Sequence, residues 1–405
     1  PDIDHCRFTA EIILDGRPAE NAELELDVSF QGKLCRTVRS TIADRTARVT
    51  VDLIVRGDLD PVHLWNPGSP NLYDLRVRLL ENGRETDAVS TYFGMRKVEV
   101  KDGKVYLNNR PVYQRLILDQ GYWPDSLLTP PSDEALRQDV QYTLDFGYNG
   151  ARKHQKLEDP RYYYWADKMG LLVWGEVPST YDFTSDSVQN LTETLMAFIQ
   201  RDYNHPCIIT WVPMNESWGI WQTYANPQQQ ALARMLYHLT KAADGTRLCS
   251  SNDGWEQVET DICALHDYAA SKADIQAHFA SRQQVEAHAC DYRPCYAEGY
   301  TPTGKEAFLV TEYGGIAFTN IGLQGDLGGM QTWGYHDKVT DEEAFFRRFQ
   351  EVTDGIREIP YCQGYCYTQL TDVMQEVNGL LTPDRRPKVD VKRFASLNRR
   401  PDGWH

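Results

Sequence analysis

Two glutamates in the chain each follow an apolar run, which is where catalytic carboxylates stand in parallel α/β folds. Glu216 comes directly after Ile208–Asn215, and Glu312 ends the run Phe308–Glu312. Two facing carboxyl groups can hydrolyse a glycosidic bond, because one protonates the leaving oxygen while the other attacks the anomeric carbon. At a separation of about 5–5.5 Å the attacking carboxylate is a nucleophile and configuration is retained. We therefore predict Glu216 and Glu312 as the two carboxylates of such a catalytic pair. Either glutamate taken alone would more simply begin a loop or cap a helix.

Other apolar runs also end in polar or aromatic residues, and a ring of such groups is hard to explain by structure alone. The candidates for sugar binding or for support of the carboxylates are Asn215, Arg152, His154, Asp119, Trp123, Glu176, His266, Tyr268, Trp218 and Trp333. We expect Trp218 to stack on a sugar face and Tyr268 to donate a hydrogen bond to Glu312. Arg152 beside a carboxylate would keep that group ionised, as a nucleophile requires.

The segments that must position these residues alternate between strand and helix from residue 97 to residue 405. Eight short apolar strands are predicted at Val112–Leu118, Gly147–Arg152, Leu171–Glu176, Ile208–Asn215, Arg247–Asn252, Ile262–His266, Phe308–Glu312 and Gly364–Gln369. Helices between them are expected to begin after Ser132, Asp159 and Asn226, around Val188, and at Glu342. This alternation predicts a (β/α)8 TIM barrel. The segment Ala269–Lys305 is polar and is expected to be an irregular insertion at the mouth.

Residues 1–96 show a different pattern. Runs such as AELELDVSF and ARVTVDLIV alternate or are apolar, and turn signals such as Glu81-Asn82-Gly83 separate them. Short strands without a helical stretch predict an antiparallel β-sandwich. The family resemblance given below implies that this sandwich is immunoglobulin-like. We expect Gly94 to end its last strand. The chain is thus predicted as multidomain, a β domain followed by an α/β domain.

Composition narrows the classes of partner. The net charge is −16, which argues against nucleic acid because phosphate binding needs clustered Lys and Arg. No apolar run is long enough for a membrane span. The nine cysteines are scattered, and the pairs Cys290/Cys295 and Cys362/Cys366 lack the spacing of a zinc site. Reduced thiols, a cytoplasmic location and no metal or cofactor are therefore expected. A carbohydrate substrate agrees with the acidic net charge. The chain could also form a homo-oligomer.

With these residues in view, the chain resembles glycoside hydrolase family 2, which contains β-galactosidases, β-glucuronidases and β-mannosidases. The stretch from Arg201 to Glu216 is similar to the family's acid/base signature, in which Asn-His-Pro leads through a strand to Trp and then to Asn-Glu. Thr311-Glu312-Tyr313-Gly314 resembles the nucleophile strand. Leu64-Trp65-Asn66-Pro67 and Phe93-Gly94-Met95-Arg96 resemble the sandwich domain and its exit. The resemblance implies a retaining exo-β-glycosidase that needs no cofactor, with Glu216 as general acid/base with a raised pKa and Glu312 as nucleophile.

The chain also departs from the family pattern. Asn149 and Arg152 match, but His154-Gln155 stands where the family usually has His three residues after the Arg, followed by Tyr-Pro. Members usually carry a jelly-roll domain in front, and Pro1 falls near the start of the sandwich, which suggests a fragment. Glucuronidases of the family typically use Asn-x-Lys, and this chain has none. β-Galactosidase is the default prediction as the commonest family activity. The alternatives are β-glucuronidase, β-mannosidase or β-glucosaminidase specificity, or a non-catalytic carbohydrate-binding protein.

Overall fold

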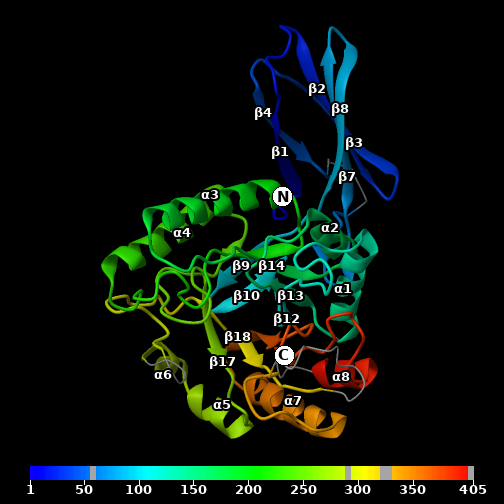
Figure 1. Cartoon of the computed structure of the whole chain (residues 1–405). Helices are drawn as coiled ribbons and strands as arrows, with labels where there is room; N and C mark the ends of the chain where they lie inside the picture. Colours follow the sequence, from blue (N-terminus) through cyan, green and yellow to red (C-terminus); the bar gives the residue numbers. More distant parts are fainter. Residues whose placement is uncertain (55–60, 288–292, 320–330, 400–405) are drawn as a thin grey trace.

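The computed structural model describes residues 1–54, 61–287, 293–319 and 331–399. A narrow β-sandwich stands on one end of a broad barrel domain, and the N-terminus lies where the two meet (Figure 1). The predicted order of a β-sandwich followed by a TIM barrel is confirmed.

The sandwich consists of two antiparallel sheets. One has the strand order β3-β2-β7-β8 and the other pairs β1 with β4. The strands are β1 (Arg7–Ile13), β2 (Ala22–Phe30), β3 (Lys33–Thr41), β4 (Thr46–Asp52), β7 (Tyr73–Glu81) and β8 (Arg84–Phe93), with a short hairpin of β5 (Trp65–Asn66) and β6 (Ser69–Pro70). Alternate residues of β2 and β4, such as Leu24, Leu26 and Val51, point inward and fill one apolar core. Strand β8 ends immediately before Gly94, as predicted.

The barrel strands form one parallel sheet in which each strand pairs with its neighbours along the chain. They are β12 (Gln114–Asp119), β13 (Gly150–Lys153), β14 (Leu172–Glu176), β15 (Ile208–Val212), β16 (Leu248–Cys249), β17 (Ile262–Asp267), β18 (Ala307–Gly314) and β19 (Cys362–Thr368). Strand β12 also pairs with β19, which curls the sheet into a barrel. Between β16 and β17 no ladder joins the described residues, so the barrel has a single seam there. All eight predicted strands are present, with ends shifted by a few residues.

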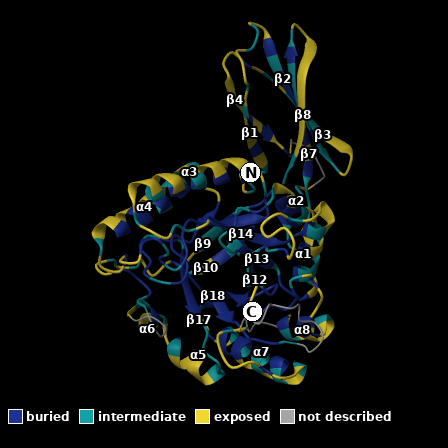
Figure 2. Cartoon of the chain, viewed as in Figure 1, coloured by how far each residue is buried: buried dark blue, intermediate teal, exposed yellow. Residues whose placement is uncertain are grey.

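The predicted helices also form, and their caps explain where they begin. They are α1 (Asp133–Asp145), α2 (Pro160–Met169), α3 (Ser185–Asp202), α4 (Pro227–Ala243) and α7 (Glu342–Arg357). The side chains of Ser132, Asp159 and Asn226 each accept a backbone N–H of the first turn. Figure 2 shows their inward stripes buried and their outer faces exposed around the buried strands.

Three features differ from the prediction. The segment Ala269–Lys305 is not wholly irregular, since it contains α5 (Lys272–His278) and α6 (Arg282–Ala287). A last helix, α8 (Val391–Asn398), was not expected. A small sheet of β9 (Val98–Lys101), β10 (Lys104–Leu107) and β11 (Arg110–Pro111) precedes the barrel, where β9 contacts β16 and β10 contacts β18.

The sandwich is fastened to the barrel by buried polar contacts. Arg96 is buried, and its guanidinium donates to the backbone oxygens of Pro206, Ile208 and Thr246 at the start of β15 and β16. Trp65 is fully buried and donates from Nε1 to the backbone oxygen of Asp167. The joint therefore lies at the opposite end of β15 from Glu216.

In the described part of the chain no helix has the length and apolarity needed to cross a bilayer.

Candidate active site

The two predicted carboxylates meet at the carboxyl ends of the barrel strands. Glu216 follows β15 and Glu312 lies near the end of β18. One oxygen from each carboxylate and one ring nitrogen of His266 lie within 4.8 Å of one another. This upper limit on the distance between the two oxygens is compatible with the roughly 5–5.5 Å between carboxyl groups of retaining glycosidases, whereas inverting ones need roughly 6.5–9.5 Å.

The backbone around Glu216 is held in an unusual conformation. Glu216 and Ser217 have φ of +52° and +55°, a region that side-chain-bearing residues rarely adopt. The turn is fixed from the neighbouring strand end, because Glu216 N donates to the Asp253 backbone oxygen at 2.8 Å and Ser217 N donates to Asn252 Oδ1 at 3.0 Å. Such conformations persist where the surroundings impose them, often at functional sites.

Glu312 is held by two predicted partners. Arg152 Nη1 donates to Oε1 at 2.9 Å, and the Tyr268 hydroxyl donates to Oε2 at 2.5 Å. Both contacts were expected from the sequence and are confirmed. Together they orient the carboxylate and place a positive charge against it.

Arg152 is the centre of a larger buried network. Its fully buried guanidinium pairs with Glu176 at 2.7 Å and with Asp253 at 3.0 Å, besides Glu312. It also donates to Asn215 Oδ1 at 2.7 Å. The three carboxylates around Arg152 offset the free-energy cost of burying its charge. The guanidinium can therefore hold the side chains around it in fixed positions.

Asn215 keeps one polar group unused. Its Oδ1 is taken by Arg152, while its buried Nδ2 has no hydrogen-bond partner among the described residues. An unsatisfied buried donor costs free energy unless a ligand satisfies it. The role of Asn215 in binding a sugar hydroxyl stays a prediction, since the residue is 1% exposed and does not line the cavity described below.

His266 connects the two glutamates and carries a proton. Its Nδ1 lies 2.7 Å from Glu216 Oε1, and its Nε2 lies 2.8 Å from Asp253 Oδ1 and 3.5 Å from Glu312 Oε1. Burial alone would lower the pKa of His266, but the charge of Glu312 and the hydrogen bonds to Asp253 and Glu216 raise it to about 10.

The expectation of a raised pKa for Glu216 is wrong for the unliganded protein. Burial acts to raise that pKa, but the hydrogen bond from His266 and the positive charges of His266, His154 and Arg152 outweigh it, so the pKa is lowered. The sequence could not show this, because His266 lies fifty residues along the chain on a different strand. The proton expected on Glu216 is instead on its neighbour.

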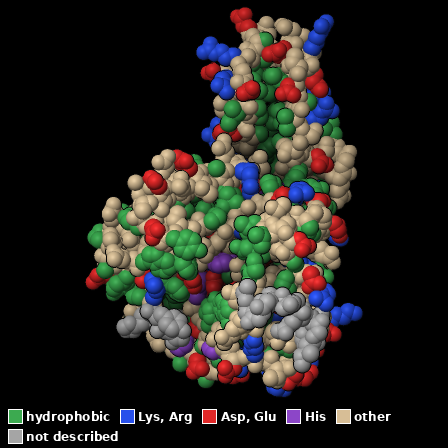
Figure 3. All heavy atoms as spheres, viewed as in Figure 1, with side chains coloured by type: hydrophobic (Ala, Val, Ile, Leu, Met, Phe, Trp, Pro, Cys, Tyr) green, Lys and Arg blue, Asp and Glu red, His purple; other side chains and the backbone are tan. Residues whose placement is uncertain are grey.

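A cavity of about 300 Å³ opens over these groups. It is lined by Glu216, Trp255, His266, Tyr268, Ala269, Tyr335 and His336. Figure 3 shows histidine and acidic side chains at the bottom of a hollow in this face. Trp255 and Tyr335 were missed by sequence reasoning, since neither directly ends a predicted strand. Trp255 packs on His266 at 5.5 Å, and the Tyr335 ring stacks on Tyr268.

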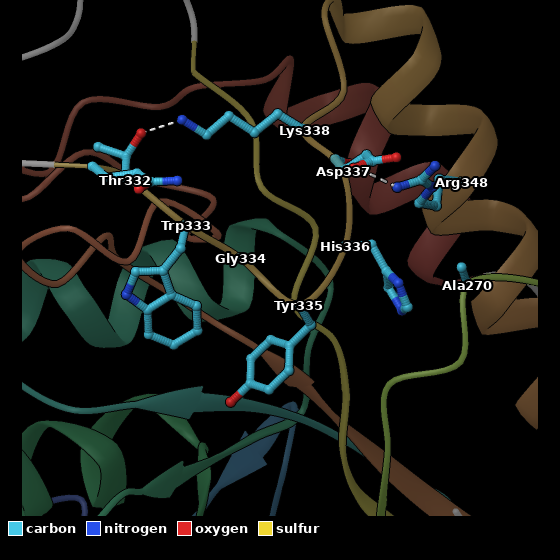
Figure 4. A pocket seen from close by; sticks show the side chains of 10 residues that line it. Ala270, Thr332, Trp333, Gly334, Tyr335, His336, Asp337, Lys338 and Arg348 are labelled. Carbon is cyan, nitrogen blue, oxygen red and sulfur yellow. Dashed lines mark hydrogen bonds between the residues drawn. The ribbon is translucent and has the colours of Figure 1, made fainter.

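A second, wider hollow of about 580 Å³ lies beside the first and shares Tyr335 and His336 with it. Figure 4 shows Trp333 and Tyr335 pointing to one side of this segment, with Lys338 and Arg348 on the other. Trp333 is therefore a rim residue at some remove from the carboxylates, and it is 41% exposed.

Three predicted binding residues line neither hollow. Asp119 is fully buried, with one oxygen bound by Lys153 at 2.7 Å and the other by the Gly121 backbone N–H. Glu176 is also fully buried, and Arg152 and His154 occupy both of its oxygens. Trp123 is covered by the guanidinium of Arg385, 3.5 Å from its ring centre. Buried positive charges hold the two carboxylates, and the Arg385 guanidinium packs on the Trp123 ring.

The remaining predicted residues lie nearer the carboxylates. His154 is partly exposed and lies 3.1 Å from Glu176 and 3.9 Å from Glu312. Trp218 follows Glu216 in the same turn, where its backbone N–H donates to the Asn215 oxygen. The cysteine pair Cys362 and Cys366 is buried in β19, and Cys290 lies outside the described residues.

Glu216, His266 and Glu312 are close enough together to hold a cation. A ring nitrogen can bind a metal only with a free lone pair, and His266 is protonated on both nitrogens at neutral pH. Arg152 already supplies a positive charge to Glu312. The donor set as it stands therefore favours protons and hydrogen bonds over a metal ion.

A (β/α)8 barrel with two facing carboxylates at its strand ends, preceded by a β-sandwich, defines a glycoside hydrolase architecture. The model of glycosyl hydrolases family 2 matches residues 1–96, and the TIM barrel domain of the same family matches residues 98–397. The chain belongs to glycosyl hydrolase family 2.

Relatives carry two different names. The chain is 29% identical over 367 residues to a β-glucuronidase of Streptococcus agalactiae, covering 83% of this chain and 58% of that protein. It is 26% identical over 240 residues to a β-galactosidase of Leuconostoc mesenteroides, covering 53% and 22%. The structure of Bacteroides uniformis β-glucuronidase superposes with a TM-score of 0.74 at 21% identity, over 97% of this chain and 48% of that one. The chain thus spans about half the length of these proteins or less.

Proposed function

We propose that this chain carries the catalytic site of a retaining exo-β-glycosidase. The observation that supports it most directly is the approach of Glu216 and Glu312 within 4.8 Å, with Arg152 and Tyr268 bound to Glu312. Glu312 attacks the anomeric carbon and forms a glycosyl ester, while the leaving oxygen takes a proton from Glu216. Glu216 then removes a proton from the water that cleaves the ester.

The Glu216–His266 pair supplies the proton. In the free protein it resides on His266, which donates to Glu216. A sugar that fills the cavity excludes water from Glu216 and so disfavours its charged form. The proton then moves from His266 Nδ1 to the Glu216 carboxyl group, which can donate it to the leaving oxygen.

We propose a neutral sugar of the β-galactoside type as the glycone. Glu376 lies close enough to Glu312 and His154 for their charges to affect its pKa, which burial raises. When Glu376 is ionised, its charge would repel that of a uronic acid bound beside Glu312. The absence of Asn-x-Lys from the sequence agrees with this assignment.

β-Glucuronidase activity is the second candidate, because a relative matched over most of this chain bears that name. Assay of aryl β-galactoside, β-glucuronide, β-mannoside and N-acetyl-β-glucosaminide side by side separates the candidates. A preference for the glucuronide would overturn the argument from Glu376.

Glu312→Gln tests the catalytic assignment. It should lower the turnover of an aryl β-glycoside by more than about a hundredfold, because a covalent nucleophile contributes several kcal/mol to the rate. Glu351→Gln, on the exposed face of α7, is the matched control and should retain the wild-type rate. A Glu312→Gln protein that keeps more than about a hundredth of the rate would exclude Glu312 as the nucleophile.

A further inference from the structure

Three aromatic side chains form an exposed cluster beside Glu216. The ring of Trp218 meets that of Trp221 at 4.6 Å between centroids and that of Tyr181 at 5.6 Å, both edge to face. Tyr181 is 75% exposed and Trp221 is 44% exposed. Single exposed aromatics are ordinary, but a contiguous exposed group of them marks a binding surface. Figure 3 shows hydrophobic side chains gathered next to the hollow that holds the histidines and carboxylates.

The two loops that carry this cluster are locked together. Tyr181 lies between β14 and α3, whereas Trp218 and Trp221 lie between β15 and α4. The Trp221 indole N–H donates to the Tyr181 backbone oxygen at 2.9 Å. At Gly219, which has φ of +76°, a Cβ would lie only 2.7 Å from the Thr180 backbone oxygen. The rings are therefore held in place before any ligand arrives, which lowers the entropic cost of binding.

The position of the cluster assigns it to one side of the reaction. Glu216 protonates the oxygen of the leaving group, so the leaving group must depart on the Glu216 side of the cavity. Trp218 belongs to the same tight turn as Glu216, because its N–H donates to the Asn215 oxygen. Tyr268 donates to Glu312 and lines the cavity together with Tyr335, so we assign these residues to the glycone.

We propose that Tyr181, Trp218 and Trp221 form a leaving-group subsite that stacks the second sugar ring of a β-linked disaccharide or oligosaccharide. This inference rests on the proposed function. A sugar suits the open platform, since one face of its ring packs on the aromatics while its hydroxyls stay in water. An aromatic leaving group would gain more from a closed apolar pocket, because its transfer from water scales with the area buried.

Three substrates with the same glycone test the proposal: the methyl β-glycoside, the p-nitrophenyl β-glycoside and a β-linked disaccharide. The glycone is the one that wild type hydrolyses best. In Trp218→Ala and Tyr181→Ala, kcat/KM for the disaccharide should fall roughly three- to tenfold relative to that for the methyl glycoside. Trp333→Ala removes a partly exposed aromatic from a different loop, between β18 and α7, and should leave this ratio unchanged. Tyr181 is mostly exposed, so its variant should fold normally even if the Trp218 variant does not.

Equal losses on all three substrates would overturn the subsite and make the cluster merely structural. A fall in kcat/KM for the p-nitrophenyl glycoside alone would show that the cluster binds an aromatic leaving group and not a sugar. If wild type hydrolyses none of the three, the proposed function fails, and titration of the disaccharide and the methyl glycoside by calorimetry tests the subsite separately. The same variants should then weaken only disaccharide binding, and unchanged binding would refute the proposal.

Discussion

At the scale of single residues, the site is organised around two cations that lie between carboxylates. Arg152 pairs with Glu176, Asp253 and Glu312, while His266 joins Asp253 to Glu216. These contacts fix the orientation of each acidic group. The proposed reaction needs two carboxylates in different protonation states, because one must be ionised while the other receives a proton.

The charge of His266 predicts how stability depends on pH. Its pKa is raised to about 10 in the folded chain from about 6.5 in an unfolded one. The protonated ring therefore stabilises the fold fully below about pH 6.5, and this contribution is lost as the pH rises towards 10. The free energy of unfolding of wild type, measured in urea, should fall between pH 7 and pH 10 by a few kcal/mol more than that of His266→Asn. Parallel curves for the two proteins would show that His266 is neutral in the fold.

The residues of the site differ in how well the sequence predicted them. Glu216, Glu312 and Tyr268 come at strand ends, where position alone indicates the mouth of the barrel. Asp119 and Glu176 stand at the same kind of position but are neutralised by Lys153 and Arg152. That pairing depends on contacts between strands, which a single sequence does not reveal.

At the scale of elements, the joint between sandwich and barrel accounts for part of the family signature. His205 and Pro206 do not reach the catalytic pocket. His205 Nδ1 lies 2.6 Å from Asp167 Oδ2, and Tyr92 from the sandwich donates to the same oxygen. The stretch that ends in Glu216 therefore begins as a contact with the sandwich, and β15 connects the two.

A single methyl group at this joint should be harmful. A Cβ on Gly94 would lie 2.8 Å from Pro206 Cβ and 3.0 Å from Trp65 Cβ. Gly94→Ala should therefore lower the free energy of unfolding by about 1–3 kcal/mol through overpacking. Gly16→Ala is the control, because a Cβ there meets no atom within 4 Å. Thermal denaturation of both variants checks this prediction. Equal melting temperatures would mean that the joint accommodates the added methyl group without loss of stability.

Elements were predicted well where periodicity and caps agree, as in α1 and α2 with Ser132 and Asp159 as caps. The hairpin of β9 and β10 was missed because its alternation continues that of the sandwich beyond Gly94. Helices α5 and α6 are too short to show a helical period in a polar segment. Local patterns of fewer than about two turns carry little information.

At the scale of the whole molecule, the two domains share their buried surface. Trp65 of the sandwich is part of the apolar core of the barrel, and Arg96 caps backbone oxygens at the base of the barrel. We expect urea unfolding to be one cooperative transition, with tryptophan fluorescence and far-UV circular dichroism coincident. Nine of the ten tryptophans lie beyond residue 96, so fluorescence follows the barrel while circular dichroism follows both domains. Two separated transitions would show that the sandwich unfolds independently.

The central claim is that Glu312 forms a covalent bond with the sugar. The protein is incubated with a 2-deoxy-2-fluoro β-glycoside of the preferred sugar that has an activated leaving group. The fluorine slows the breakdown of the glycosyl-enzyme, and mass spectrometry of a protease digest then locates the added sugar. The account predicts one fluorosugar on the peptide that contains Glu312 and none after Glu312→Gln. A label on Glu216 or another residue, or turnover with inversion and no label, would contradict it.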